Sequence, residues 1–341
     1  MIGAVRVKVK NSRNNYDFTL RRNITILCGD SGRGKTTLYE MIREFNRFGK
    51  EESGVSISCD KSVIALSGNE WEDKLSKISN SIIVIDEDSR FISSKDFADA
   101  VKNSSNYFLI ITRKYLTQLP YSVDEILKIE GGKNKKFLPV YNAYDRFYDD
   151  PNSKVFPFKP EIIITEDSNS GYQYFSEIAE KLQIKCVSAR GKSNIYSCVS
   201  KYDGKDVLVI ADGAAIGSEV AKLVEEQKLS RGRVVIFLPE SFEWLILISG
   251  VVISSDVDEL THTENYVDSS KYMSWEQYFT EFLMSITQND RKMAYRKDKL
   301  AEFYKKGKVR DKILSQIKHL DCKEMLNVTD EQIAMARSEK D

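Results

Sequence analysis

The chain has 341 residues and a mass of 39.1 kDa, which is longer than a typical single-core domain and favours two domains. Hydrophobic residues make up 41% and charged residues 30%, a composition that is typical of globular proteins and excludes an intrinsically disordered chain. The 51 basic and 51 acidic residues leave no formal net charge, which argues against a uniformly basic nucleic-acid coat protein.

The sequence predicts neither a secretory signal nor a membrane segment. The N-terminal residues alternate apolar and charged side chains, and the longest apolar run, residues 244–253, is interrupted by Ser249 and Gly250. Five cysteines lie far apart without a C-x-x-C pair, and only two histidines occur, so neither a disulfide framework nor a zinc site is indicated. We therefore expect a cytoplasmic protein.

A strand, a glycine-rich loop and a helix follow one another near the N-terminus. Residues 24–28 (ITILC) predict a strand, the next eight residues have the pattern G-x-x-x-x-G-K-[ST], and a three- and four-residue apolar spacing then predicts a helix that ends at Gly49. This order predicts a phosphate-binding loop. The residues expected to bind the nucleotide are Gly29, Asp30, Ser31, Gly32, Arg33, Gly34, Lys35, Thr36 and Thr37.

The residue types in this loop explain the expected chemistry. Glycines allow backbone N–H groups to surround a phosphate at the start of a helix. Lys35 is predicted to reach the terminal phosphates and to act in catalysis, and the Thr36 hydroxyl is predicted to coordinate Mg²⁺. The alternative is a glycine-rich turn that only caps the helix.

Two further strands are predicted to end near this loop. Residues 81–85 (SIIVI) lead into Asp86 and Glu87, for which we predict roles as magnesium carboxylate and as general base. An ordinary acidic loop after a buried strand is the alternative. Residues 107–111 (YFLII) predict the next strand, after which Thr112 and Arg113 are candidates to sense the γ-phosphate or to stabilise transition-state charge.

Residues 1–140 resemble the ABC-type branch of P-loop ATPases. The resemblance rests on the early hairpin AVRVKVKNSRNNYDFTL, the loop GDSGRGKTT and the strand IIVIDED. It implies ATP and Mg²⁺ as cofactors, and it implies that Tyr16 or Phe18 stacks on adenine. About fifty residues separate Lys35 from Asp86, too few for the usual helical insertion. LSGNE (residues 66–70) is a fragment of the family signature, and Thr112 stands where transporters of this branch have a histidine, which argues against transport coupling.

A change of pattern divides the chain. Residues 144–160 contain three of the six prolines and separate two segments of strand and helix patterns. We predict an α/β fold with an ABC-like ATPase domain over residues 1–145, a second α/β domain over residues 158–256, and a helical region over residues 272–341.

The second segment contains four predicted strand-helix units. Strands are predicted at residues 161–165, 185–189, 206–211 and 233–238, with helical patterns between them, which favours a mostly parallel sheet. Acidic residues follow three of these strands: Glu166 and Asp167, then Asp212, then Glu240. Because ligands bind at the carboxyl ends of such strands, the pattern predicts an Mg²⁺ site.

This order resembles the Toprim domain, and the whole chain resembles the overcoming-lysogenization-defect (OLD) nucleases, which join an ABC-type ATPase to a Toprim domain. The resemblance implies that Glu166 and Asp212 bind metal and act in catalysis on phosphodiesters. Residues 191–194 (GKSN) resemble a turn of the nuclease branch. Ala214 replaces the second aspartate of the family's Asp-x-Asp, and Asp167 stands in place of a glycine. Asp167, Glu219 and Glu240 are candidates to substitute for the missing ligand.

Two other interpretations of this segment stay open. The same acidic residues fit the pocket of a response-regulator receiver with Asp212 as phosphoacceptor, although no lysine follows a fifth strand. Alternatively, the strand-end carboxylates only cap helices and face water in a degenerate α/β domain.

The C-terminal region is locally basic. Residues 290–323 contain twelve basic and five acidic residues, and Tyr295, Phe303 and Tyr304 lie among them. Such a pattern suits contact with nucleic-acid phosphates and bases, whereas a solvated helical face is the common alternative.

The glycine loop predicts an ATP-hydrolysing protein, and the resemblance to OLD nucleases implies that hydrolysis regulates an Mg²⁺-dependent action on nucleic acid in defence against mobile elements. The alternative is a nucleotide-dependent sensor or scaffold without nuclease activity. Expected partners are nucleic acid and either a second copy of the chain or another protein, and no membrane.

Overall fold

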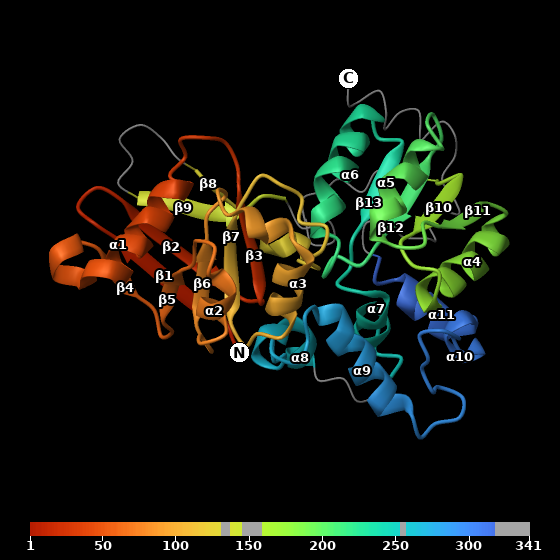
Figure 1. Ribbon diagram of the computed structural model, residues 1–341. Helices are drawn as coiled ribbons and strands as arrows, with labels where there is room; N and C mark the ends of the chain where they lie inside the picture. The colour runs from red at the N-terminus through yellow and green to blue at the C-terminus, as the bar shows by residue number, and fades with distance from the viewer. Residues whose placement is uncertain (131–136, 145–158, 253–256, 318–341) are drawn as a thin grey trace. The chain divides into compact units, whose positions relative to one another are not determined.

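The computed structural model describes residues 1–130, 137–144, 159–252 and 257–317, and the chain divides into two compact units (Figure 1). The first unit contains Met1–Asp145 together with His262–Trp275, and the second contains Arg146–Thr261 together with Glu276–Asp341. Both units combine parallel strands with helices, so the fold is mixed α/β, as predicted. The sequence did not indicate that residues 262–275 belong with the first unit.

The first unit contains a nine-stranded sheet in the order β4-β1-β2-β9-β8-β3-β7-β6-β5. The five strands from β8 to β5 run parallel, whereas β1 pairs with β2 and with β4 in antiparallel fashion. The predicted hairpin and the three predicted strands of this segment are therefore confirmed. The strands are β1 (Val5–Lys10), β2 (Asn15–Leu20), β3 (Ile24–Cys28), β4 (Ser56–Ser58), β5 (Val63–Ala65), β6 (Ile82–Ile85), β7 (Tyr107–Ile111), β8 (Ile126–Ile129) and β9 (Phe137–Asn142).

Helices flank this sheet. They are α1 (Lys35–Ser53), α2 (Trp71–Leu75) and α3 (Lys95–Lys102), with 3₁₀ turns η1 (Arg90–Ser93), η2 (Val123–Glu125) and η3 (Thr263–Asn265). α1 buries Leu38, Met41 and Ile42, as its apolar spacing predicts. The helix is interrupted at its predicted end, because Gly49 adopts a non-helical φ of +73°, and helical backbone then resumes up to a cap at Gly54.

The second unit contains a four-stranded parallel sheet in the order β11-β10-β12-β13. All four predicted strands are present, as β10 (Ile162–Thr165), β11 (Lys185–Ser188), β12 (Val207–Ile210) and β13 (Val234–Phe237). The helices of this part of the chain are α4 (Ser170–Leu182), α5 (Lys192–Ser200), α6 (Gly217–Leu229), α7 (Phe242–Ile248), α8 (Val257–Thr261), α9 (Trp275–Thr287), α10 (Glu302–Lys305) and α11 (Gly307–Leu314).

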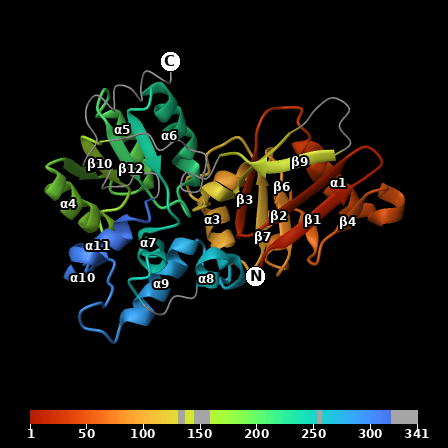
Figure 2. The ribbon, with the colours of Figure 1, turned by 180° about the vertical axis from the view of Figure 1, so that it is seen from behind.

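The path of the chain through the second sheet creates a crevice. From β10 the chain crosses to β11 on one side, and it then returns past β10 to β12 and β13 on the other side. α4 packs on β10 and β11, whereas α5 and α6 pack on each other (Figure 2). Right-handed crossovers in opposite directions put these helices on opposite faces. The loops after β10 and β12 therefore diverge, which opens a crevice at the carboxyl ends of the strands.

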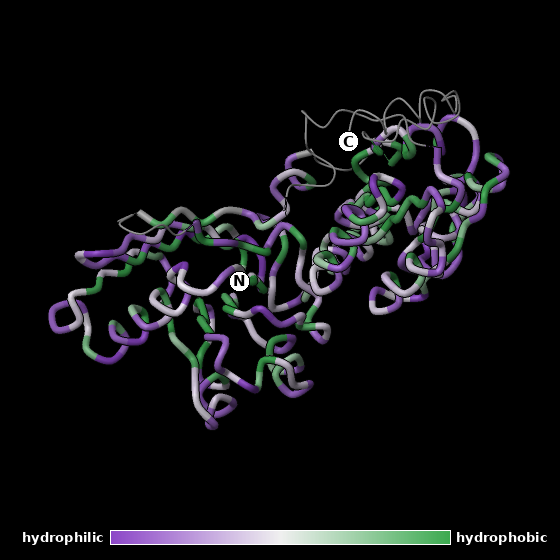
Figure 3. The backbone as a smooth tube through the Cα atoms, turned by 90° about the horizontal axis from the view of Figure 1, so that it is seen from above, coloured by the Kyte–Doolittle hydropathy of each residue, from purple (hydrophilic) through white to green (hydrophobic). Residues whose placement is uncertain are grey.

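Hydrophobic stretches of the chain are short. In Figure 3 they alternate with hydrophilic stretches along the whole tube, and among the described residues no helix is long and apolar enough to cross a membrane. The predicted C-terminal helical region is interrupted, because residues 288–301 between α9 and α10 form turns and irregular backbone.

Candidate functional site

The glycine loop, residues 29–34, joins the end of β3 to the start of α1. Gly29, Gly32 and Gly34 adopt φ angles of +109°, +75° and +101°, which side-chain-bearing residues rarely adopt. No side chain caps the N-terminus of α1. The backbone N–H groups at the start of a helix have no intrahelical partner, so this loop offers donors for an anion.

Lys35 lies inside the glycine loop. Its ammonium group donates hydrogen bonds to the carbonyl oxygens of Gly29 (2.7 Å) and Asp30 (2.6 Å), and the residue is only 4% exposed. Burial lowers the pKa of Lys35, while Glu87 acts in the opposite direction. The loop therefore holds a positive charge at its centre, whereas Thr36 and Thr37 in the first turn of α1 are exposed.

Tyr16 supports this loop from within the core. Its hydroxyl group donates a hydrogen bond to the carbonyl oxygen of Gly34 (2.8 Å), and the residue is 0% exposed. The expected stacking of Tyr16 or Phe18 on adenine is therefore wrong for this structure, because both rings are buried. A Cβ atom at residue 34 would lie 2.8 Å from the Tyr16 hydroxyl oxygen, so glycine is required there for space as well as for φ.

Asp86 follows β6, which is separated from β3 by the single strand β7. Neighbouring strands lie about 4.8 Å apart, so the ends of β3 and β6 are separated by about 10 Å across β7. Asp86 is 6% exposed, and its buried Oδ1 atom has no hydrogen-bond partner. Burial raises the pKa of this carboxyl group. A buried carboxylate oxygen without a partner is costly, and a bound cation would relieve that cost, so Asp86 fits a metal ligand.

Glu87 and Arg113 follow the neighbouring strands β6 and β7. The two side chains form a bidentate ion pair, in which the Arg113 Nε and Nη2 atoms lie 3.1 Å and 3.0 Å from the two carboxylate oxygens. Both side chains are partly exposed, with 53% of Arg113 and 29% of Glu87 accessible. Thr112 is buried, so of the two residues predicted to sense phosphate only Arg113 reaches the surface.

A cavity of about 600 Å³ lies beside Asp86. Residues of α1, of the loop before α2 and of the segment after β6 line it, namely Tyr39, Glu40, Arg43, Ser67, Gly68, Asn69, Trp71, Asp86, Asp88, Ser89, Arg90 and Phe91. Asp86 therefore faces open space that is large enough for a small ligand.

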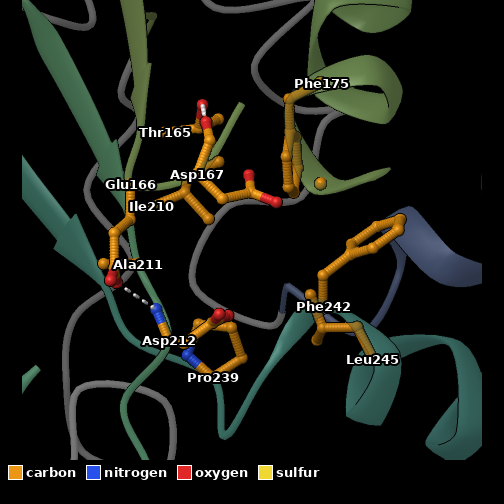
Figure 4. A pocket seen from close by; sticks show the side chains of 11 residues that line it. Thr165, Glu166, Asp167, Phe175, Ile210, Ala211, Asp212, Pro239, Phe242 and Leu245 are labelled. Atoms are coloured by element: carbon orange, nitrogen blue, oxygen red, sulfur yellow. Dashed lines mark hydrogen bonds between the residues drawn. The ribbon is translucent and has the colours of Figure 1, made fainter. Parts of the chain in front are cut away.

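Glu166 and Asp212 come together at the ends of β10 and β12. The Asp212 backbone N–H donates a hydrogen bond to Glu166 Oε2 (3.1 Å), shown as the dashed line in Figure 4. Burial, followed by the nearby carboxylate of Glu276, raises the pKa of both groups. These residues line a small cavity at the gap between diverging loops, which we call the second site.

Of the three candidates to replace the missing aspartate, only Asp167 lines this cavity. Its carboxylate points towards Phe175 and Phe242 in Figure 4, and its Oδ1 accepts a hydrogen bond from the Tyr172 N–H (3.2 Å). Glu219 is buried, accepts a hydrogen bond from the Ser218 hydroxyl and pairs with Lys222. Glu240 is also buried, and neither residue lines the cavity.

Three charged residues outside the cavity lining act electrostatically on Asp212, and the sequence analysis did not connect them with the second site. Glu243 at the start of α7 is 1% exposed, Glu276 lies at the start of α9, and the Lys297 ammonium lies 3.9 Å and 2.5 Å from their respective Oε1 atoms. Burial works against the ammonium ion, but the carboxylates of Glu243, Glu276 and Asp212 outweigh it and raise the pKa of Lys297. No motif or spacing connects these positions, so only the tertiary structure reveals them.

The basic C-terminal region lacks the free basic side chains and exposed aromatic rings that were expected of a nucleic-acid surface at several of its described positions. Among residues 290–317, five basic side chains pair with acidic ones: Arg296, Lys297, Lys305, Lys306 and Arg310. Tyr295 and Tyr304 are buried, so they cannot stack on bases as expected, whereas Phe303 is partly exposed. Lys318 and Lys323 lie outside the described residues.

No known protein family matches the sequence, and no curated protein matches it. Within the described part of the chain, no group of three or more His, Cys, Asp or Glu side chains is arranged to hold a metal ion. Three carboxylates line the second site, those of Glu166, Asp167 and Asp212. Carboxylate oxygens are ligands that suit Mg²⁺, which usually keeps several waters.

Proposed function

We propose that the chain binds and hydrolyses ATP with Mg²⁺ at the glycine loop, and that this reaction regulates an Mg²⁺-dependent action on nucleic acid at the second site. The observation that carries the ATP proposal is the grouping of Lys35 within a positive-φ loop and of Asp86, whose buried oxygen lacks a partner, about two strand spacings away. The resemblance to ABC-type ATPases supports ATP as the nucleotide.

Each residue has a role in this proposal. The loop N–H groups and Lys35 bind the phosphates, because both present positive charge where α1 begins. The Thr36 hydroxyl and Asp86 hold Mg²⁺, which supplies charge neutralisation at the terminal phosphates. Glu87 orients the attacking water, and Arg113, its ion-pair partner, reaches the γ-phosphate.

ATP turnover by Lys35→Ala tests the first part. We expect the variant to lose measurable hydrolysis and at least about tenfold of its ATP affinity, because the ammonium group that lies against the loop carbonyl oxygens is removed. Lys50→Ala is the matched control, since Lys50 is an exposed lysine of the same helix. Turnover by Lys35→Ala at the wild-type rate would contradict the proposal.

The second part rests on Glu166 and Asp212. Carboxylates at neighbouring strand ends in a crevice form the arrangement that the Toprim resemblance implies for phosphodiester chemistry. The test is Mg²⁺- or Mn²⁺-dependent cleavage of DNA and RNA, with and without ATP, by wild type and by Glu166→Ala and Asp212→Ala. Glu180→Ala, an exposed change on α4, is the control. Cleavage that survives both site variants would rule out this site as its source.

A sensor or scaffold without nuclease activity is the second candidate. One observation favours it: Ala214 is buried at the position where the Toprim pattern has an aspartate. In that case a second copy of the chain or another protein would be the partner. Wild type that hydrolyses ATP and cuts no nucleic acid would select this candidate, and ATP-dependent association would then identify the partner.

A further inference from the structure

We propose that the cavity of about 600 Å³ beside Asp86 binds the 5′-hydroxyl end of a nucleic-acid strand, and that the γ-phosphoryl group of ATP is transferred to this hydroxyl. The inference rests on the ATP and Mg²⁺ site proposed above. It gives that site an acceptor other than water, and it assigns a ligand to the cavity, which we call the acceptor cavity.

The acceptor cavity adjoins the residues proposed to hold Mg²⁺. Glu40 and Arg43 line it from α1, and they follow Thr36 by four and seven residues. Positions at this spacing share one face of a helix, so Thr36 lies on the cavity side of α1, one turn before Glu40. Asp86 lines the cavity from the end of β6, and its buried Oδ1 atom has no hydrogen-bond partner. A terminal phosphate bound between Thr36 and Asp86 therefore borders the cavity.

The size of the acceptor cavity exceeds what an attacking water molecule needs. A water molecule takes up about 30 Å³ in the liquid, whereas the cavity has a volume of about 600 Å³. Pockets that bind small molecules have volumes of this order. The nucleoside at the end of a strand is a ligand of that size, so the cavity has room for it beside the terminal phosphate.

Two aromatic rings form part of the cavity wall. Trp71 and Phe91 stack with ring centroids 4.8 Å apart and an angle of 14° between the rings. Trp71 is buried, whereas Phe91 is partly exposed, so Phe91 offers aromatic surface to a ligand. Ser67 and Asn69 also line the cavity, and both are exposed donors and acceptors of hydrogen bonds. Unpaired bases bind to proteins by stacking on such rings and by hydrogen bonds to their edges.

The charges of the acceptor cavity leave one guanidinium group for a phosphate. Arg43 Nη2 and Glu40 Oε2 form an ion pair (2.5 Å), and Asp86 faces the proposed Mg²⁺ site. Asp88 is exposed to solvent. Arg90 is also exposed, and it has no ion-pair partner among the residues that the structure describes. Guanidinium groups bind phosphate oxygens with paired hydrogen bonds, so Arg90 suits the first backbone phosphate of the strand.

The proposed step is a phosphoryl transfer in which the acceptor replaces water. The 5′ oxygen of the strand forms a bond to the γ-phosphorus, while the bond between that phosphorus and the bridging oxygen of ADP breaks. The proton of the hydroxyl group passes to the carboxylate of Glu87, which directly follows Asp86 in the chain. The products are ADP and a strand with a 5′-phosphate.

The first experiment follows the γ-phosphoryl group. The full-length protein is incubated with Mg²⁺, with ATP radiolabelled in the γ-phosphate, and with DNA and RNA oligonucleotides that carry either a 5′-hydroxyl or a 5′-phosphate. We expect label on 5′-hydroxyl DNA, RNA or both, no label on the 5′-phosphorylated oligonucleotides, and no transfer by Lys35→Ala. ADP and free phosphate are measured in the same samples.

The outcomes of this experiment separate the inference from the function on which it rests. Consumption of ATP with the label found only in free phosphate would overturn the transfer and leave ATP hydrolysis standing. Equal labelling of the 5′-phosphorylated oligonucleotides would overturn the assignment of the 5′-hydroxyl as acceptor. If no ATP is consumed, the proposed ATPase fails, and the inference fails with it.

The second experiment measures binding without ATP or Mg²⁺, by fluorescence anisotropy of a 5′-hydroxyl trinucleotide labelled at its 3′ end. Arg90→Gln should bind this probe about tenfold more weakly than wild type, because a charge-assisted contact to phosphate is lost. Arg47→Gln is the matched control, since Arg47 is an exposed arginine of α1 that does not line the cavity, and it should bind as wild type does. Equal affinities of Arg90→Gln and wild type would overturn the acceptor cavity.

Discussion

The carboxylate of Glu87 and the guanidinium of Arg113 form a bidentate ion pair at the ends of two adjacent strands. The pair orients the carboxylate of Glu87 close to Lys35, whose pKa it influences. Partly exposed ion pairs contribute at most about 1 kcal/mol, so a phosphate group can exchange for the carboxylate at little cost. The pair can therefore be broken when a nucleotide binds.

Glu87→Gln should lower ATP turnover by about 100-fold or more while ATP binding stays within about threefold of wild type, because a positioned base acts in the reaction and not in binding. Turnover and equilibrium binding of a fluorescent nucleotide measure the two effects separately. Asp88→Asn removes an exposed carboxylate from the next position and should leave both quantities unchanged. Equal losses in the two variants would show that local charge matters and that Glu87 has no special role.

Asp86→Asn should stabilise the protein without ligand and abolish its stabilisation by Mg²⁺ and ATP. The charge on a buried oxygen without a partner is removed, which we expect to raise the free energy of unfolding by about 1 kcal/mol at pH 8. Because burial raises the pKa of Asp86, this gain is largest above that pKa and disappears at acid pH, where the wild-type group is protonated. Thermal unfolding with and without Mg²⁺ and ATP measures both effects. A destabilised variant would contradict this account.

Gly34→Ala should lower the free energy of unfolding by more than about 2 kcal/mol, because it combines a φ of +101° with a contact of 2.8 Å to the Tyr16 hydroxyl. Tyr16→Phe alone should cost about 1 kcal/mol through its lost hydrogen bond. The double variant should lose less stability than the sum of the two single losses, because the hydroxyl group that clashes with the new Cβ atom is absent. Urea unfolding of the four proteins gives the coupling, and strict additivity would show that the contact is unimportant.

Glu125→Gln should remove a pH-dependent loss of stability. Glu125 is 3% exposed and accepts a hydrogen bond from the Thr25 hydroxyl (2.6 Å), and burial raises its pKa to about 7, against the opposing effect of Arg22. Between an unfolded pKa of 4.5 and this value the folded state binds more protons, so wild-type stability falls as pH rises through that range.

Relative to Glu125→Gln, wild type should therefore lose roughly 3 kcal/mol between pH 4.5 and pH 8. Urea unfolding at pH 4.5 and pH 8 measures this difference. Glu52→Gln, an exposed change in α1, should show the same difference from wild type at both pH values. If Glu125→Gln behaves like Glu52→Gln, the buried carboxyl group has no influence on the pH dependence.

The sequence predicted the strands well because their apolar runs are local signals. ITILC, SIIVI and YFLII are almost entirely buried in the first sheet, as short continuous apolar runs indicate. Gly49 interrupts the helix where the sequence predicted its end, but the helical backbone that resumes up to Gly54 was missed, because a glycine does not show whether a helix restarts after it. The return of residues 262–275 to the first unit was missed because contacts such as that of the Met1 amino group with Asp268 (2.8 Å) leave no periodic pattern.

The candidate sites were predictable only where one segment carries the chemistry. The glycine loop is one such segment, and its residues could be named from spacing alone. Tyr16 was named with the wrong role, since the sequence shows an aromatic residue in a strand and does not show which face of the strand is buried. Glu243, Glu276 and Lys297 come from three distant segments, so their grouping depends on how the elements pack.

The hydrogen bond between Tyr16 and Gly34 couples the antiparallel strands to the glycine loop, so that a substitution in one of them affects the other. The loop conformation requires glycine at residue 34, and the Tyr16 hydroxyl occupies the space where a side chain would begin. Leu138 lies on the same side, since its Cδ1 atom would be 3.4 Å from a Cβ atom at residue 34. A chimaera that takes its hairpin from one protein and its loop from another would have to transfer both residues together. Divergent copies of this protein should therefore change positions 16 and 34 as a pair or keep both.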